Sequence, residues 1–236
     1  MNAAIIAAGE GSRLQTDGVA VAKPLVPICG VPLIDRLIRM ALASHAESLS
    51  IIVNEEMTDV RRYCENLSLS IPLNLLVRST PSSMHSLFAL APYLNHAPFY
   101  LTTVDTIFLE VEFKKYLAFA QHQQHTDGVL AVTDFIDDEK PLCAKLDKQQ
   151  RITTFSDSQE GYRWATGGIY YFSPRIFNLI PDALAANTVR LRNFLRLLLQ
   201  HHYTLHGYAF SKIIDVDHAK DIAAAEEFLT SHNERS

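Results

Sequence analysis

The sequence predicts an α/β protein: a three-layer α/β/α, Rossmann-like domain with a mixed, mostly parallel central sheet. Short apolar runs alternate with amphipathic segments of about ten residues through the first half of the chain. This alternation is typical of βαβ units, whose helices cover both faces of a parallel sheet. The composition agrees, because 236 residues with 48% hydrophobic side chains can bury one sizeable core.

The first half supplies four expected strands with helices between them. The apolar runs at 3–8, 50–54, 73–77 and 99–104 fit buried strands. The helices expected between these strands cover 33–43, 58–67 and 83–94. Thr58 is the expected N-cap of the second of these helices.

The second half is expected to be more mixed. Its expected elements are strands at 128–133, 142–146, 151–155, 168–172, 205–210 and 212–214, and helices after Ser173-Pro174, over 191–199 and over 219–230. The 142–146 and 151–155 strands fit an antiparallel pair, and a charged turn at 137–140 precedes them. Without a repeat or linker, one domain is expected over 1–236.

Charge and cysteine usage narrow the class of protein. The 21 basic and 26 acidic side chains give a net charge of −5, so no basic excess is available to hold a nucleic-acid backbone. Cys29, Cys64 and Cys143 are odd in number and far apart, which argues against a disulfide framework or a thiolate zinc site. No signal peptide or long apolar span is recognisable, so we expect a cytoplasmic protein without a membrane partner.

The most informative segment is a glycine-bearing loop directly after the first expected strand. It reads Ala7, Ala8, Gly9, Glu10, Gly11, Ser12, Arg13 and Leu14. Glycines at the carboxyl end of a strand let backbone N–H groups approach an anion, and Arg13 and Lys23 add positive charge there. A triphosphate fits this loop. The alternative is a tight turn at Gly9 and Gly11 with two surface cations.

Two other glycine motifs do not fit. A dinucleotide-binding G-x-G-x-x-G needs glycine or alanine where this chain has Leu14, which opposes an NAD(P)-dependent oxidoreductase. A Walker A loop needs Gly-Lys-Ser or Gly-Lys-Thr, and neither tripeptide occurs.

The loop resembles that of the sugar-nucleotidyltransferases, the NDP-sugar pyrophosphorylases and their small relatives. That family's A-A-G-x-G-x-R loop and Lys-Pro-Leu segment are matched by Ala7, Ala8, Gly9, Gly11, Arg13 and Lys23-Pro24-Leu25. Ala22 stands where the family commonly has proline. The resemblance implies that the loop, with Ser12, wraps the triphosphate and that Arg13 and Lys23 act in catalysis. It also implies a nucleotide-binding half at about 1–110 and an acceptor-binding half at about 111–236.

Asp105 is the first candidate metal ligand. It ends the fourth expected strand, where a carboxylate faces the ligand crevice of an α/β sheet. Hard carboxylate oxygens suit Mg²⁺, which typically takes one or two of them and completes its shell with water and phosphate oxygens. A turn or cap aspartate is the alternative. The family places a metal-binding aspartate at this strand end, and Asp105 matches it.

Asp217 is the second candidate metal ligand, with Asp215 in reserve. The two carboxylates stand two residues apart before the last expected helix. This stretch resembles the I-D-x-x-x-D-L ending of small cytidylyltransferases, in which the closing aspartate holds the metal. The alternative for Asp217 is N-capping of the helix, and Asp221 is expected to be a solvated acid in the first turn.

The resemblance also suggests base and acceptor contacts. Ser82 and Ser83 match a small-residue segment that lies against the nucleobase, and Ser83 is also a candidate helix cap. Gly167 and Gly168 match the acceptor-side strand, where glycine lets a sugar approach the backbone; a β-bulge is the alternative. The family's Glu-Lys-Pro signature is not recognisable at 157–163.

The histidines and one arginine cluster are expected to lie on the surface. His122 and His125 follow a Gln-rich helix end, His201 and His202 are adjacent, and no H-E-x-x-H motif occurs. Arg190, Arg192 and Arg196 are expected on a solvated helix face, with a partner surface as the alternative.

These features predict an Mg²⁺-dependent nucleotidyltransferase. It joins a nucleoside triphosphate to a phosphorylated small acceptor, foremost a sugar 1-phosphate, and releases pyrophosphate. A cytidylyltransferase for a phosphocholine- or phosphonate-type acceptor is the alternative enzyme. A nucleotide- or sugar-binding regulatory module without catalysis is the alternative from another class, although Lys23 and both acids are present.

Overall fold

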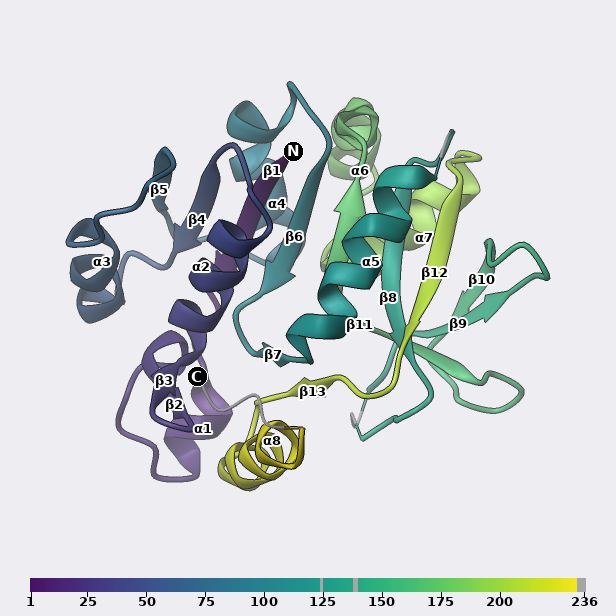
Figure 1. Ribbon diagram of the computed structural model, residues 1–236. Helices are drawn as coiled ribbons and strands as arrows, with labels where there is room; N and C mark the ends of the chain where they lie inside the picture. Colours follow the sequence, from purple (N-terminus) through teal and green to yellow (C-terminus); the bar gives the residue numbers. More distant parts are fainter. Residues whose placement is uncertain (124, 138–139, 233–236) are drawn as a thin grey trace.

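Strand β1 (Asn2–Ala7) is an interior strand of the sheet, and all six of its residues are buried. The computed structural model describes residues 1–123, 125–137 and 140–232 (Figure 1). β1 pairs in parallel with β4 (Leu49–Val53) on one side and β6 (Phe99–Thr103) on the other, and β5 (Leu73–Val77) continues the parallel order beyond β4. The carboxyl ends of β1, β4 and β6 therefore meet at one edge.

The other side of the sheet is built around β11 (Trp164–Phe172). β11 runs antiparallel to β6 and to β8 (Gly128–Thr133), and β8 pairs in parallel with β12 (Leu205–Phe210). β11 is thus reversed within otherwise parallel neighbours, and the expected mixed, mostly parallel sheet is confirmed. The antiparallel pair β9 (Cys143–Leu146) and β10 (Ile152–Ser156), also expected, branches from the start of β11.

Two short ribbons lie outside this sheet. β2 (Pro27–Ile28) pairs with β3 (Val31–Pro32). β7 (Thr106–Ile107) pairs antiparallel with β13 (Ile214–Asp215), which Figure 1 shows running beneath the carboxyl edge of the sheet. The strand expected at 212–214 is therefore present but shifted, and it brings the C-terminal segment to the end of β6.

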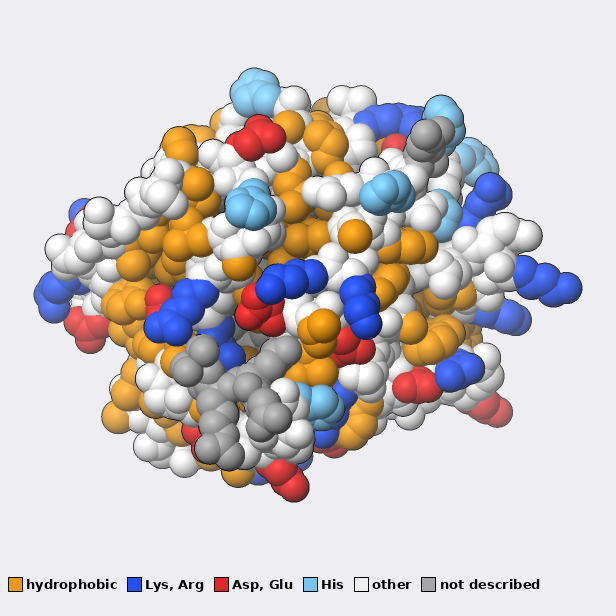
Figure 2. Space-filling view, viewed as in Figure 1, with side chains coloured by type: hydrophobic (Ala, Val, Ile, Leu, Met, Phe, Trp, Pro, Cys, Tyr) orange, Lys and Arg blue, Asp and Glu red, His pale blue; other side chains and the backbone are white. Residues whose placement is uncertain are grey.

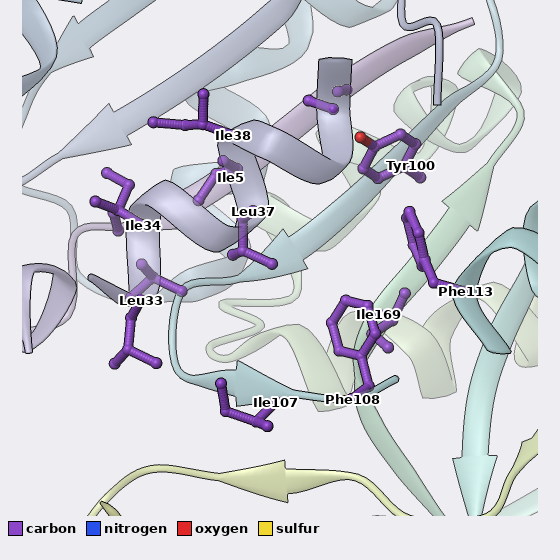
Figure 3. Packing of buried hydrophobic residues seen from close by; sticks show 14 of the residues in the cluster. Ile5, Leu33, Ile34, Leu37, Ile38, Tyr100, Ile107, Phe108, Phe113 and Ile169 are labelled. Carbon is purple, nitrogen blue, oxygen red and sulfur yellow. The ribbon is translucent and has the colours of Figure 1, made fainter. Parts of the chain in front are cut away.

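One face of the sheet is covered by helices α2 (Leu33–Ala43), α3 (Thr58–Glu65) and α5 (Glu110–His122). Helix α8 (Ala219–Ser231) lies beyond the carboxyl edge, against β2 and β13 (Figure 1). Leu33, Ile34, Leu37 and Ile38 of α2 form an apolar stripe that packs over Ile5 of β1 (Figure 3). α5 was not among the expected helices, although its apolar spacing predicts it; its buried residues are Phe113, Tyr116, Leu117 and Ala120.

The opposite face carries α4 (Ser83–Leu94), the 3-10 helix η2 (Pro174–Leu179), α6 (Ile180–Ala185) and α7 (Leu191–Gln200). Met84, Leu87 and Leu90 of α4 pack with Phe194 and Leu198 of α7 in a second apolar cluster against the sheet. Helices on both faces confirm the three layers. The halves assigned to nucleotide and acceptor remain a prediction, as does the single domain.

Some local expectations need correction. The N-cap position of α3 is Met57, and Thr58 is its first residue. The helix expected after Ser173-Pro174 is present as η2, and Ser173 caps it, because its side chain accepts a hydrogen bond from the Arg175 backbone N–H. Residues 138–139 of the expected charged turn lie outside the described residues.

Candidate active site

A cleft of about 470 Å³ opens at the carboxyl edge of the sheet, where β1 and β6 end. Every residue expected to bind or neutralise a triphosphate lines it except Ala7, which is fully buried at the end of β1. The expected residues that line it are Ala8, Gly9, Gly11, Ser12, Arg13, Lys23, Ser82, Ser83, Asp105 and Asp217. The fold thus brings together segments from both ends of the chain.

The two loop glycines have different structural reasons. Gly11 has a φ of +64°, which disfavours any residue with a side chain. A Cβ at this position would also lie only 2.8 Å from Cβ of Lys23. Apart from Gly9 itself and its two chain neighbours, no heavy atom of the described residues lies within 4 Å of a Cβ placed on Gly9. Gly9 therefore leaves room toward the cleft, whereas Gly11 shapes the turn that brings Lys23 close.

Lys23 is the central cation of the cleft. It begins the 3-10 helix η1 (Lys23–Leu25), and only 8% of its side chain is exposed. Its Nζ donates hydrogen bonds to Oδ2 of Asp105 and to Oδ1 of Asp217, each at 2.6 Å. Two carboxylates far apart in the sequence thus face one point, and Lys23 is no surface cation.

The charges of this cluster stabilise one another. Burial disfavours the Lys23 ammonium, yet Asp105 and Asp217 outweigh it and raise the pKa of Lys23 above its ordinary value. Burial likewise opposes ionisation of Asp105, but the charge of Lys23 and hydrogen bonds from Lys23 and Thr103 lower the pKa of that carboxyl. Both groups are therefore charged at neutral pH.

Asp217 and Asp215 have separate partners. Asp217 also accepts a hydrogen bond from Nη1 of Arg13 at 2.7 Å, so both expected cations reach it. Asp215 instead accepts a 3.2 Å hydrogen bond from the Thr106 hydroxyl. Asp217, rather than Asp215, faces Lys23 together with Asp105.

The position of Asp217 depends on β13 and on the start of α8. The Val216 backbone N–H donates to the carbonyl of Asp105 at 2.9 Å, which ties this segment to the end of β6. The N-cap of α8 is His218, and the Asp221 carboxylate accepts hydrogen bonds from the backbone N–H groups of Asp217 and His218. Asp221 thus belongs to a capping box instead of being merely solvated, and Asp217 is free of the capping role.

A second cleft, of about 340 Å³, adjoins the first. Ser83, Thr103, Asp105 and Asp217 line both clefts. The second cleft extends along the start of β11 toward the first residues of α7, so it lies on the expected acceptor side. The carboxylates of Asp105 and Asp217 therefore stand where the two clefts meet.

Gly167 and Gly168 line the second cleft, but neighbouring protein atoms already explain why they are glycines. A Cβ on Gly168 would collide with the hydroxyls of Thr103 and Thr106, and one on Gly167 would collide with Ile213. The β11–β8 register also shifts between Thr166 and Tyr170, as the bulge interpretation expected. Their contact with an acceptor stays a prediction.

Ser82 and Ser83 line the cleft but their hydroxyls already have partners. The Ser82 hydroxyl accepts from the Arg190 backbone N–H at 3.1 Å and lies 2.9 Å from Nδ1 of His85. The Ser83 hydroxyl accepts from the Leu191 backbone N–H at 3.4 Å. The N-cap position of α4 is Ser82, not Ser83, and neither serine makes a side-chain capping bond. These serines therefore connect the first cleft to the start of α7.

Polar residues that were not expected from the sequence also line the first cleft, among them Asn54 and Thr103. Asn54 directly follows β4, and its Oδ1 accepts hydrogen bonds from the Glu56 backbone N–H and the Ser79 hydroxyl. The rule that located Asp105, a polar residue at the carboxyl end of a buried parallel strand, could have found both.

The donor chemistry of the two carboxylates suits a magnesium ion. Asp105 and Asp217 each place one oxygen 2.6 Å from Nζ of Lys23, and Mg²⁺ is commonly held by one or two carboxylates plus substrate phosphates. In the described ranges no group of three or more His, Cys, Asp or Glu side chains could hold a metal alone. A metal at these carboxylates therefore needs oxygens from phosphate or water.

The fold and this cleft define the class of the protein: an open α/β protein with its ligand site at the carboxyl edge of the sheet. Acidic and basic side chains are paired at that edge. The profile of the MobA-like NTP transferase domain matches residues 3–201, and the chain belongs to that family. The resemblance found in the glycine loop is thereby confirmed.

Relatives and solved structures agree with this membership. The chain is 26% identical over 189 residues to a mannose-1-phosphate guanylyltransferase catalytic subunit beta of Danio rerio, covering 76% of this chain and 52% of that protein. It is 24% identical over 234 residues to a mannose-1-phosphate guanyltransferase of Hypocrea jecorina, covering 94% and 62%. The chain therefore spans somewhat more than half the length of these relatives.

Two solved structures share the fold over nearly the whole chain. The inositol-1-phosphate CTP transferase of T. maritima superposes with a TM-score of 0.83 at 19% identity, covering 99% of this chain and 96% of that one. A Bacillus anthracis protein assigned as a glucose-1-phosphate thymidylyltransferase, in complex with sucrose, gives 0.81 at 18% identity, covering 97% and 94%.

Surface charge and helix hydropathy add two observations. Figure 2, viewed onto the face covered by α2 and α5, shows basic and acidic side chains interspersed among apolar ones. Among the described residues, no helix is long and apolar enough to cross a membrane.

Proposed function

We propose that the protein is a nucleotidyltransferase that joins a nucleoside triphosphate to a phosphorylated small acceptor, foremost a sugar 1-phosphate, and releases pyrophosphate. The observation that carries the proposal is the junction of the two clefts. Asp105 and Asp217 line both clefts and converge on the buried Lys23. One cleft suits the nucleotide and the other suits the acceptor.

In the proposed reaction an acceptor phosphate oxygen forms a bond to the α-phosphorus of the nucleotide. The bond from that phosphorus to the oxygen of the leaving pyrophosphate breaks. A phosphate monoester is largely anionic near neutral pH, because its second pKa is about 6, so the protein need not supply a strong base. Catalysis then rests on positioning and on stabilising charge.

The cations and the glycine loop would bear the charge of the triphosphate. Arg13 and Lys23 carry positive charge into the first cleft, and the space at Gly9 lets phosphates approach the backbone. Such preorganised groups stabilise the charge that develops on leaving pyrophosphate. Lys23 also bonds to both Asp105 and Asp217 and so keeps the two carboxylates together where the clefts meet.

Mg²⁺ is the proposed cofactor, and Asp105 and Asp217 are the residues that would hold it. When bound, the ion neutralises phosphate charge at the reacting centre. The carboxylates themselves orient this edge of the cleft through Lys23, Arg13 and Thr103.

Two alternative functions are tested beside the proposed one. A cytidylyltransferase is favoured at the level of the fold by the likeness to a CTP transferase, so CTP belongs among the nucleotides tested. A regulatory module without catalysis would have no need for two carboxylates and a buried lysine at the junction of two clefts.

The direct test measures pyrophosphate release with ATP, CTP, GTP and UTP, with and without Mg²⁺, against sugar 1-phosphates, inositol 1-phosphate, phosphocholine and 2-aminoethylphosphonate. We expect Mg²⁺-dependent release with one nucleotide and a sugar 1-phosphate. Nucleotide binding without release for every combination would favour the regulatory module. Release only with CTP and phosphocholine or the phosphonate would establish the alternative enzyme.

A further inference from the structure

A third cleft, of about 410 Å³, lies at the start of α7 and is rich in cations. Lys140, Arg190, Arg192 and Arg196 line it, against one acid, Asp157. Four cations against one carboxylate is a local excess in a chain whose overall charge is −5. Such a concentration of guanidinium groups suits carboxylate or phosphate groups.

This cleft continues the acceptor cleft. Arg190 and Arg192 line both. The acceptor cleft therefore has Asp105 and Asp217 at the junction with the nucleotide cleft and two arginines at its junction with the third cleft. A molecule whose phosphate reaches the first junction extends toward the arginines with its other end.

The arginines are held in place yet incompletely neutralised. Arg192 and Arg196 both pair with Asp157, at 3.3 Å and 2.8 Å, so one carboxylate serves two guanidinium groups. Arg192 also donates to the backbone carbonyl of Lys140 at 2.7 Å. Asp157 is 67% exposed, so water screens its attraction and a ligand anion can compete for the same donors.

The backbone of Arg190 is fixed by the nucleotide side of the site. Its φ is +72°, a region that non-glycine residues rarely adopt. The Ser82 hydroxyl accepts its backbone N–H, and Ser83 does the same for Leu191. The arginine end of the acceptor cleft is thereby anchored to the loop that lines the nucleotide cleft.

We propose that the acceptor carries a second acidic group, a carboxylate or a phosphate, at the end away from the phosphate that forms the new bond, and that Arg190, Arg192 and Arg196 bind it. The proposal rests on the proposed function, because it takes the second cleft as the acceptor site. The excess positive charge disfavours an acceptor that ends in a cation, such as phosphocholine.

A purely structural role for these arginines makes a different prediction. If Arg192 and Arg196 served only to hold Asp157 against α7, their removal would change stability slightly and would not alter the choice of ligand, because ion pairs with an exposed carboxylate contribute little. Ligand choice therefore separates the two roles.

The test measures acceptor dissociation constants by calorimetry on the full chain. Four probes share one sugar and one anomeric phosphate and differ at C6: glucose 1-phosphate, glucuronic acid 1-phosphate, glucose 1,6-bisphosphate and 6-amino-6-deoxyglucose 1-phosphate. Their neutral, carboxylate, phosphate and ammonium groups distinguish the two sources of the second anion. We expect at least one acidic probe to bind about tenfold or more tightly than the neutral probe, and the ammonium probe to bind weakest.

Variants assign that preference to the arginines. In the double variant Arg192→Gln with Arg196→Gln, the ratio between acidic and neutral probes should fall to near one while nucleotide affinity is retained. Arg192→Lys with Arg196→Lys should restore part of the ratio, because the charge remains. Arg62→Gln is the control, since Arg62 forms an ion pair with an exposed carboxylate, Asp59 on α3, at the far edge of the sheet (Figure 1).

Equal binding of all four probes to the wild-type protein overturns the inference, as does an acidic preference that survives in the double glutamine variant or failure of every probe to bind. Pyrophosphate release is measured separately. Acidic preference without any release would retain the binding site and reject the proposed reaction; release without acidic preference would do the reverse.

Discussion

The two halves of the site hold their cations in different ways. Lys23, in the nucleotide half, is 8% exposed and lies between two carboxylates from distant parts of the chain. Arg192 and Arg196, in the acceptor half, share one exposed carboxylate, Asp157. A buried ammonium between two carboxylates is fixed. The guanidinium groups of Arg192 and Arg196, although only 27% and 24% exposed, share a carboxylate that is 67% exposed and that a ligand anion can replace.

The difference separates chemistry from selectivity. In the proposed reaction the nucleotide half carries charges that every turnover needs, so changes there should lower turnover with all acceptors. The acceptor half carries charges that a ligand can recruit, so changes there should alter which acceptor binds. Substitutions in the two halves therefore have distinct signatures.

The largest expected effect is that of Asp105→Asn. The amide preserves shape but removes the charge that holds a hard cation and pairs with Lys23, so kcat should fall about 1000-fold with every acceptor. Steady-state pyrophosphate release measures this. Asp59→Asn on α3, where the carboxylate is exposed, is the control. Near-normal activity of a folded Asp105→Asn protein would remove Asp105 from the site.

Asp217→Asn should follow, with a loss of about 100-fold or more. Its carboxylate faces Lys23 and Arg13, whereas Asp215 bonds to Thr106, so Asp215→Asn should lower turnover much less. The N-cap of α8 is His218, and both variants should melt close to the wild-type temperature. Equal, mild losses at the two positions would place the second metal ligand elsewhere.

Lys23→Ala should lower turnover about 100-fold, because one preorganised cation is lost. It should also cost on the order of 2 kcal/mol of stability, since Asp105 is left partly buried without its ammonium. Arg13→Ala is the comparison, because Arg13 is half exposed and its loss should affect turnover with little change in stability. Kinetics and urea unfolding measure both; unchanged nucleotide affinity and turnover in Lys23→Ala would contradict the role of the lysine.

A pair of glycine substitutions contrasts the halves directly. Gly9→Ala points a methyl group into open space, so it should leave stability unchanged and weaken nucleotide binding about tenfold. Gly168→Ala collides with Thr103 and Thr106 and should cost roughly 1–3 kcal/mol of stability. Calorimetric unfolding and nucleotide titration distinguish the two. The comparison fails if Gly9→Ala destabilises the fold and Gly168→Ala does not.

The smallest expected effect is a pH dependence of stability outside the site. His206 is buried beside the Thr126 hydroxyl; burial and the charge of Arg151 lower its pKa, and Asp147 opposes them weakly. Near pH 6.5 the unfolded chain therefore binds a proton on this histidine more readily than the folded chain does. The contribution of His206 to the free energy of unfolding is complete above that pH and declines as the pH falls below it. Lys23, whose pKa is raised, loses its contribution only above about pH 10.5.

Urea unfolding of wild type and His206→Gln at pH 7.5 and 5.5 isolates this contribution from the other histidines. The wild-type protein should lose more stability over the interval than the variant does. Identical losses in the two proteins would show that His206 titrates normally.

Much of the site was predictable because it follows local rules. Buried apolar strands can be read from the sequence, and a polar residue that ends such a strand lies at the carboxyl edge, which located Asp105 and could have located Asn54. The glycine loop was predictable because an open approach and a positive φ both need glycine, as Gly9 and Gly11 show.

The tertiary structure alone decided between roles that share one local pattern. From the sequence, Asp217 could equally be a helix cap or a site residue. In the structure the Val216 N–H donates to the Asp105 carbonyl, and Asp221 accepts the hydrogen bonds that cap α8. Ser82 could have faced a ligand freely, but its hydroxyl holds Arg190, which lies 108 residues away. The sequence determines which groups carry charge and where strands end; which charges meet depends on strand order and on chain crossings, and these follow from burying apolar surface across the whole chain.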